Sequence, residues 1–266
     1  MTGRLELVCG PDAAGRSSLL RQYVSAPMHV SKPWREGGLL IVNAINATAG
    51  LFSGDHIETE IEVKPRAQML VTASSATRAH RMISGMASVR QSIHVANDAW
   101  LEIHPALFIP HAGSNYRQET AITLEARARL LWSETVAPGR VASGEAWAFR
   151  GYQNKFSIAH DGRAIAREAY ALDAECPSVR AVRHQFQNAY HGSFYAVGID
   201  FSPDLPTAIS ALQTPDCWVG CARLDAPAIC VRLVAADNIQ MARATAKIRS
   251  ILHAAFLRPL PELRRN

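Results

Sequence analysis

The sequence predicts a mainly β protein, an antiparallel or stacked body of short strands that ends in one covering helix. Runs in which apolar and polar residues alternate with a period of two recur along the chain, and turn signals separate them at fairly regular spacing. Almost no helical period appears between residues 30 and 175. A fold in which strands alternate with helices is therefore disfavoured.

The clearest alternation runs over residues 57–63, where Ile, Thr, Ile and Val alternate with three glutamates. This pattern predicts a strand with one solvated face. A turn signal then leads into a second predicted strand at residues 68–72. The same arrangement of strand, turn and strand is predicted at residues 89–95 and 100–104, so a unit of two strands repeats.

Later strands are predicted at residues 121–126, 130–136 and 145–149, and a hairpin follows them. Its strands, at residues 156–160 and 164–170, flank Asp161-Gly162, a strong signal for a tight turn. Between about residues 175 and 225, prolines interrupt short apolar runs, which predicts loops. Because no Gly/Ser-rich linker divides the chain, residues 1–266 are predicted to form a single domain.

The final element is a helix that begins at Asp237 or Asn238, either of which can cap it, and ends before Pro259. Its predicted apolar stripe consists of Ile239, Ala242, Ala246, Ile248, Ile251, Leu252, Ala255 and Phe256. Arg243, Lys247 and Arg249 are predicted to face away from the sheet that this helix covers.

Composition excludes several classes of protein. The chain has 266 residues, of which 48% are hydrophobic and 19% are charged, so it is not disordered. The net charge of +5 comes mostly from scattered arginines, which disfavours nucleic-acid binding. The N-terminus has no apolar core of a signal peptide, and no apolar run is long enough to span a bilayer. We therefore expect a cytoplasmic protein without a membrane or nucleic-acid partner.

Two local patterns suggest metal or nucleotide chemistry. Cys217 and Cys221 have C-x3-C spacing, but no second cysteine pair or histidine pair follows, so free thiols are the favoured interpretation and their role stays open. Gly10–Ser17 matches the phosphate-binding pattern G-x4-G-K-[ST] except at Arg16. In the P-loop-like alternative, residues 17–24 would be a helix and Phe194–Asp200 a Walker-B-like strand; a hairpin turn at Gly10 is the other interpretation.

Four segments between residues 32 and 147 stand out in a fixed order. The first is Lys32-Pro33-Trp34, and the second is similar to N-P-x-G-G-x-x-G-G-D at Asn46, Gly50, Gly54 and Asp55. The third contains Thr72, Thr77 and Arg78. The last and most specific follows E-x4-G-R-x-A-x-G-E-x-[FW] at Glu134, Gly139, Arg140, Ala142, Gly144, Glu145 and Trp147. Together these segments resemble the motifs of the UreD family, called UreH in some organisms.

The chain also departs from the family pattern. The doubled glycines are reduced to Ala49-Gly50 and Ser53-Gly54, and the corner similar to F-x-G-A is altered at residues 109–113. The sequence is therefore identified as a divergent member.

The resemblance implies a β-helix-like stack of short strands with a C-terminal helix and few other helices. It also implies a chaperone or scaffold, not an enzyme. UreD-like proteins join the accessory proteins UreF and UreG, bind the urease apoprotein and help to deliver nickel to its active site. The resemblance therefore implies a dimeric heteromeric complex, no tightly bound cofactor, and nickel only in transit.

Three carboxylates are our candidates for the nickel path, because of their motif positions: Asp55, Glu134 and Glu145. A structural interpretation, in which Arg140 pairs with one of them to fix a corner, stays open beside it. Arg243, Lys247 and Arg249 are candidates for docking a partner protein. Two alternatives to the urease role also remain, namely the P-loop-like NTPase at Gly10–Ser17 and a β-rich protein-binding module unrelated to urease.

Overall fold

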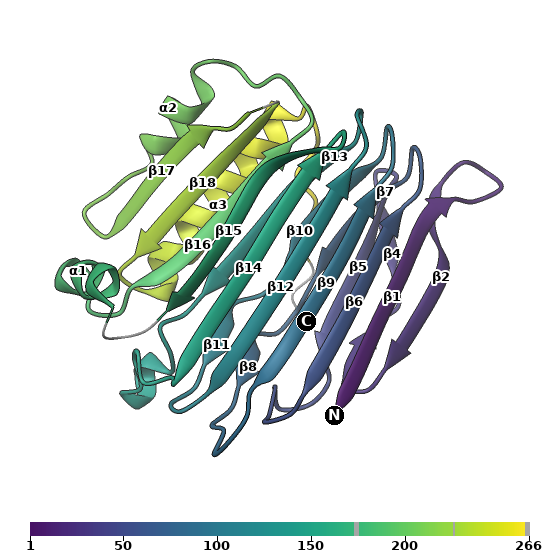
Figure 1. The fold of residues 1–266 in the computed structure, drawn as a ribbon. Coiled ribbons are helices and arrows are strands. Elements are labelled where there is room, and N and C mark those ends of the chain that lie inside the picture. The colour runs from purple at the N-terminus through teal and green to yellow at the C-terminus, as the bar shows by residue number, and fades with distance from the viewer. Residues whose placement is uncertain (173–175, 226, 264–266) are drawn as a thin grey trace.

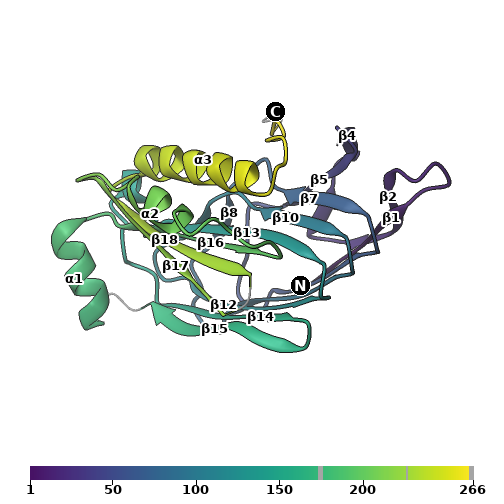
Figure 2. The same cartoon turned by 90° about the horizontal axis from the view of Figure 1, so that it is seen from above.

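Two β-sheets packed face to face form the body of the protein (Figure 1). The structure is a computed structural model that describes residues 1–172, 176–225 and 227–263. One sheet has seven strands in the order β15-β14-β12-β9-β6-β1-β2, and the other has eleven, with β17-β18-β16-β13-β10-β7-β5-β3 as its main path. Seen from above, α3 covers the outer face of the larger sheet, and the smaller sheet lies on the other side (Figure 2).

Parallel strands make the centre of both sheets. In the larger sheet these are β5 (Leu39–Asn46), β7 (Gln68–Thr72), β10 (Trp100–His104) and β13 (Arg129–Val136). In the smaller sheet they are β6 (His56–Val63), β9 (Ala87–Val95), β12 (Asn115–Leu124) and β14 (Gly151–His160). The chain alternates between the sheets along this series, so successive strand pairs stack like coils of a solenoid. This confirms the predicted stack of short strands.

Further strands extend both sheets. β1 (Thr2–Pro11) lies parallel to β6, and β2 (Ser17–Ser25) folds back on it. β15 (Arg163–Leu172) pairs with β14 across the predicted Asp161-Gly162 hairpin. The larger sheet continues through β16 (Tyr190–Val197), β18 (Ala228–Ala235) and β17 (Cys217–Arg223). Its short strands are β3 (Met28–Val30), β4 (Trp34–Glu36), β8 (Thr77–Ala79) and β11 (Phe108–Pro110).

The β1–β2 hairpin contradicts the P-loop-like interpretation. Asp12 Oδ1 accepts hydrogen bonds from the backbone N–H groups of Ala14 and Arg16, both at 2.9 Å, and closes a tight turn. Ser17–Ser25 is then an antiparallel strand, whereas a phosphate-binding loop leads into a helix whose N-terminus faces the phosphate. The Gly10–Ser17 segment is therefore a hairpin turn.

The region predicted as loop between residues 175 and 225 contains regular structure, namely α1 (Pro177–Gln185), β16, α2 (Leu205–Ser210) and β17. Two of the prolines, Pro177 and Pro206, misled the prediction because they stand in the first turns of α1 and α2, where a missing N–H removes no helical bond. Conversely, residues 145–149, predicted as a strand, form a loop after the short 3-10 helix η1 (Val141–Ser143).

The terminal helix α3 (Asn238–Ala255) begins where the sequence predicts, with the Asp237 side chain accepting from Gln240 N at 2.8 Å. Its buried face, however, is rotated from the predicted stripe. The buried residues are Met241, Ala244, Thr245, Ile248, Arg249, Leu252 and His253. Ile239, placed in the stripe by the sequence, is 61% exposed. In the described part of the chain, no helix is long and apolar enough to cross a membrane.

Cys217 and Cys221 lie on β17 as free thiols, and both pack with the core beneath α3. Burial raises the pKa of both, that of Cys221 to about 11. Within the described ranges, no group of three or more His, Cys, Asp and Glu side chains is arranged to hold a metal ion.

Candidate functional site: a cavity between the sheets

A cavity of about 180 Å³ lies between the two sheets, and its mainly apolar wall includes several polar side chains. The walls come from β6, β9 and β12 on one side and from β5, β7, β10 and β13 on the other. Its polar lining residues are Asn46, Thr59, Thr72, Thr77, Gln91, Gln118, Glu134 and Thr135. Among the described residues that line it, only Glu134 carries a charge.

Glu134 faces the cavity because β13 alternates strictly, with Leu130 and Trp132 on the same inner face. Its two carboxylate oxygens meet amide groups from the opposite sheet. Gln118 Nε2 donates to Oε1 at 2.8 Å, and Asn154 Nδ2 lies 3.4 Å from Oε2. These donors are neutral, so burial dominates and raises the pKa of Glu134, an effect that the Gln118 hydrogen bond and the charge of Arg232 only reduce.

Tyrosines surround the amides that hold Glu134. The Tyr116 hydroxyl donates to Gln118 Oε1 at 2.8 Å, and Asn154 Nδ2 donates to the Tyr170 hydroxyl at 3.1 Å. Burial, and then the charge of Glu134, raise the pKa of both hydroxyl groups. The phenols therefore stay protonated at physiological pH, and the carboxylate is held within a network of neutral groups.

A half-buried histidine, His191, lies one strand away. β13 and β16 pair antiparallel, with Glu134 opposite Ser193 and Val136 opposite His191. Burial lowers the pKa of His191 to about 4, so its ring is neutral at physiological pH. Its Nε2 is buried and has no hydrogen-bond partner among the described residues. Neutral imidazole and carboxylate oxygen are both ligand types that divalent transition metals accept.

The nearby cation on β18 is already paired. Arg232 forms an ion pair with Glu168, and the Tyr195 hydroxyl donates to the same carboxylate at 2.6 Å. Arg232 attracts Glu134 electrostatically, but among the described contacts it forms no hydrogen bond with Glu134. The hydrogen-bond donors of Glu134 are therefore the Gln118 and Asn154 amides.

The other two candidate carboxylates lie in loops and already have partners. Asp55 accepts from Phe52 N at 2.8 Å and from the Met1 amino group at 2.9 Å. Glu145 forms a bidentate pair with Arg140, with Nε to Oε2 at 2.8 Å, and also accepts from Ala112 N at 3.1 Å. The Arg140 hydrogen bond, followed by that of Ala112, lowers the pKa of Glu145 to about 2. Both carboxylates therefore fix corners of the chain.

The remaining motif residues gather at the end of the molecule where β6, β9, β12 and β14 begin, the lower end in Figure 1. Gly50 has φ +148°, and a Cβ on it would lie 2.4 Å from the Arg78 carbonyl oxygen, so only glycine fits there. Gly54 and Gly144 also have positive φ, at +79° and +71°. Thr77 lines the cavity, Arg78 is exposed, and Trp147 is buried against Phe149. The second and third motifs and residues 139–147 of the fourth are thus brought together, whereas Trp34 of the first motif lies beside Ile41 of β5 and Glu134 lies apart on β13.

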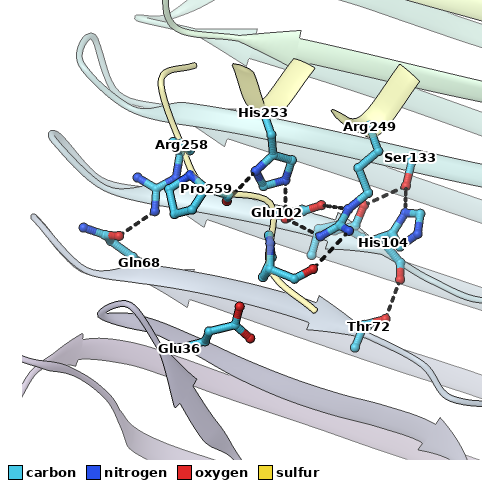
Figure 3. A network of polar contacts seen from close by, with 12 residues as sticks. Glu36, Gln68, Thr72, Glu102, His104, Ser133, Arg249, His253, Arg258 and Pro259 are labelled. Atoms are coloured by element: carbon cyan, nitrogen blue, oxygen red, sulfur yellow. Dashed lines mark hydrogen bonds and ion pairs between the residues drawn. The ribbon is translucent and has the colours of Figure 1, made fainter. Parts of the chain in front are cut away.

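The three basic residues proposed for docking divide into two groups. Arg243 and Lys247 are exposed on the free face of α3, as predicted. Arg249 is not, because the helix is rotated from the predicted phase, and this residue is 5% exposed and ion-paired with Glu102 of β10 (Figure 3). Sequence reasoning missed three polar residues on strand faces that point between the sheets, namely Gln118, Asn154 and His191. It also missed Glu102, which β10 points toward α3.

Comparison with known proteins agrees with the motif arrangement. The profile of the family described as UreD urease accessory protein matches residues 1–265. A urease accessory protein UreD from Opitutus terrae is 35% identical over 262 residues, which cover 96% of each chain. One from Deinococcus radiodurans is 34% identical over 220 residues, covering 80% of this chain and 77% of that protein. One from Acetivibrio thermocellus is 33% identical over 156 residues, covering 58% and 60%. The resemblance found in the motifs is thereby confirmed, and this chain belongs to the UreD family of urease accessory proteins.

Proposed function

We propose that this protein is a maturation scaffold that binds the urease apoprotein together with UreF-like and UreG-like accessory proteins and assists nickel delivery to the urease active site. It acts in the cytoplasm within a dimeric heteromeric complex and catalyses no reaction of its own. Membership of the urease accessory family supports the role. The observation that carries the nickel part is the cavity, whose wall holds one carboxylate without a bonded cation.

The proposed role of Glu134 is to bind nickel weakly as it passes. A carboxylate bonded only to neutral amides keeps lone pairs for a cation, whereas a carboxylate paired with arginine does not. A single carboxylate, with a neutral imidazole one strand away, binds an ion loosely enough to release it. Nickel is thus cargo in this proposal, not a resident cofactor.

Asp55 and Glu145 complete the proposed path at the end where the loops gather. Each already holds a turn, so in this proposal they would act by shaping and charging the opening. Arg243 and Lys247 of α3 remain the proposed docking residues for a partner, and reversing both charges should weaken that binding.

Reconstituted urease activation tests the nickel role. The Glu134→Gln variant keeps the size of the side chain and removes its charge, so activation at limiting nickel should fall at least tenfold, with binding of the partner proteins retained. The matched control is Glu62→Gln, which removes a half-exposed carboxylate, paired with Lys64, from the outer face of β6. Asp55→Ala and Glu145→Ala should reduce activation less. Full activation by all three variants of the candidate carboxylates would refute the path.

A further inference from the structure

Exposed apolar side chains lie on the two loops that precede β6 and β9. Phe52, Ile83 and Met86 are 45%, 95% and 38% exposed, and we call these three side chains the loop patch. Gly54 N donates to the Met86 carbonyl oxygen at 3.0 Å, and the Ser53 hydroxyl donates to the Ser84 carbonyl oxygen. The two loops are therefore bonded side by side, and both carry exposed apolar side chains.

The loop that carries Ile83 is held by side chains from outside it. Arg150 donates to the Ile83 carbonyl oxygen at 3.2 Å and to the Gly85 carbonyl oxygen at 2.7 Å. Asn115 Nδ2 also donates to the Gly85 carbonyl oxygen, at 2.9 Å. Phe52 stacks on His80 with ring centroids 4.6 Å apart. The chain thus fixes the backbone while leaving the apolar side chains in solvent. A surface fixed before binding loses little conformational entropy when a partner docks.

Positive charge borders the loop patch. Arg78, Arg81 and Arg150 are all exposed, and none of the three forms an ion pair with a described residue. The carboxylates of this end are already occupied, Asp55 by the Met1 amino group and Glu145 by Arg140. The border therefore attracts negative charge, and exposed guanidinium groups around an apolar centre are typical of protein interfaces.

We propose that the loop patch is a docking surface for a protein that presents an apolar pocket bordered by carboxylates, with Ile83 as the side chain that enters the pocket. A single, rigidly presented aliphatic side chain suits a shaped protein pocket better than a lipid surface or a flat self-contact. This inference rests on the proposed function, since the partner is sought among the UreF-like protein, the UreG-like protein and the urease apoprotein.

The test compares binding of the full-length protein and its variants to each of these three purified proteins. Ile83→Asp should weaken binding to at least one partner tenfold or more, and Arg78→Glu with Arg81→Glu should weaken the same binding and reduce its dependence on salt. The matched control is Leu20→Asp, which changes another exposed residue, 54% exposed, toward the far end of the β1–β2 hairpin. This control should bind like the unchanged protein. Because Ile83 is almost wholly exposed, its substitution leaves the fold intact.

Three results would overturn the inference. If the Ile83 and arginine variants bind all three partners as tightly as the unchanged protein does, the loop patch is not a docking surface. The proposed function would stand in that case. Loss of self-association, or of binding to anionic vesicles, with partner binding intact would assign the patch to a second copy or to a membrane. Failure of the unchanged protein to bind any of the three would reject the proposed function, and this inference with it.

Discussion

Glu102 and Glu134 lie on neighbouring parallel strands of the larger sheet, and their surroundings differ in almost every respect. Glu102 points from β10 toward α3, whereas Glu134 points from β13 into the space between the sheets. Glu102 is 1% exposed, and Glu134 is half-buried at the cavity wall. Glu102 bonds to the guanidinium of Arg249 and the imidazole of His253, whereas Glu134 bonds to two neutral amides. The comparison teaches that the partners of an enclosed carboxylate decide whether it stabilises the fold or remains available to a ligand.

The Glu102 network fastens α3 and the segment after it to the sheet (Figure 3). Arg249 Nε donates to Oε1 at 2.6 Å, and His253 Nε2 lies 3.0 Å from Oε2. The same two side chains hold carbonyl groups beyond the helix, Arg249 that of Pro261 at 3.5 Å and His253 that of Pro259 at 3.1 Å. Burial alone would raise the pKa of Glu102, but the hydrogen bonds from His253 and Arg249 outweigh it and lower the pKa to about 2.

The largest expected effect is that of Glu102→Ala. The change leaves Arg249 buried with its charge unpaired, and breaking a buried pair in this way costs about 3–5 kcal/mol. Glu134→Ala, which leaves only neutral amides, should cost about 1–2 kcal/mol. Urea unfolding of both variants, followed by circular dichroism, gives the two free energies of unfolding. Equal losses would contradict the comparison.

The second effect concerns acid pH. The pKa of Glu102 is about 2 in the folded protein against 4.5 without the fold, so the unfolded state binds the proton first. The stabilisation is therefore complete above pH 4.5 and is lost as pH falls toward 2. It amounts to about 3 kcal/mol. Urea unfolding of the unchanged protein and of Glu102→Gln across this range should show a difference that shrinks with acid. The Glu145 pair is present in both proteins and cancels, and a difference that stays constant with pH would rule out this linkage.

Much of the fold could be predicted, because period-two alternation reports strands directly. The β7 and β10 bounds match the prediction, and the Asp161-Gly162 turn and the Asp237 cap are where the sequence places them. Errors arose where local signals have two meanings. Proline was taken to interrupt structure although it begins α1 and α2, and the apolar residues of α3 fit more than one helical face.

The candidate site was harder to predict because its contacts join distant residues. Arg249 and Glu102 are 147 positions apart, so no local pattern could place this arginine inside the protein. Glu134 was found only through its family motif. Gln118 and Asn154, which bond to it, are polar residues at inward positions of β12 and β14, and the strand alternation could have marked them. Alternation predicts which side chains of a strand point inward, but it does not predict which residue of the other sheet each one contacts.

A third, smaller effect tests whether geometry as well as charge matters at Glu102. Arg249→Lys keeps the positive charge, but an ammonium group cannot match the guanidinium fork that reaches both carboxylate oxygens and Pro261. We expect a loss of about 1–2 kcal/mol in the free energy of unfolding. Exposed Arg243→Lys on the same helix is the control and should change stability little. An unchanged free energy of unfolding for Arg249→Lys would mean that charge alone stabilises the network.

The smallest effect should be that of Glu134→Gln on stability, and its dependence on pH should have the opposite sign to that of Glu102. Burial raises the pKa of Glu134, so the folded state binds the proton more tightly than the unfolded state. The ionised carboxylate therefore lowers stability as pH rises from the unfolded pKa of 4.5 through the folded one. Glutamine carries no such charge. The variant should thus match the unchanged protein below pH 4.5 and exceed it modestly, by about 1 kcal/mol or less, at neutral pH. Thermal unfolding of both proteins at a series of pH values measures this difference.

Adding nickel should narrow the difference in stability between the two proteins at neutral pH, because a cation beside Glu134 offsets the cost of the buried charge. A glutamine variant that is less stable at every pH would mean that Glu134, like Glu102, is held as an ion by partners that stabilise the fold.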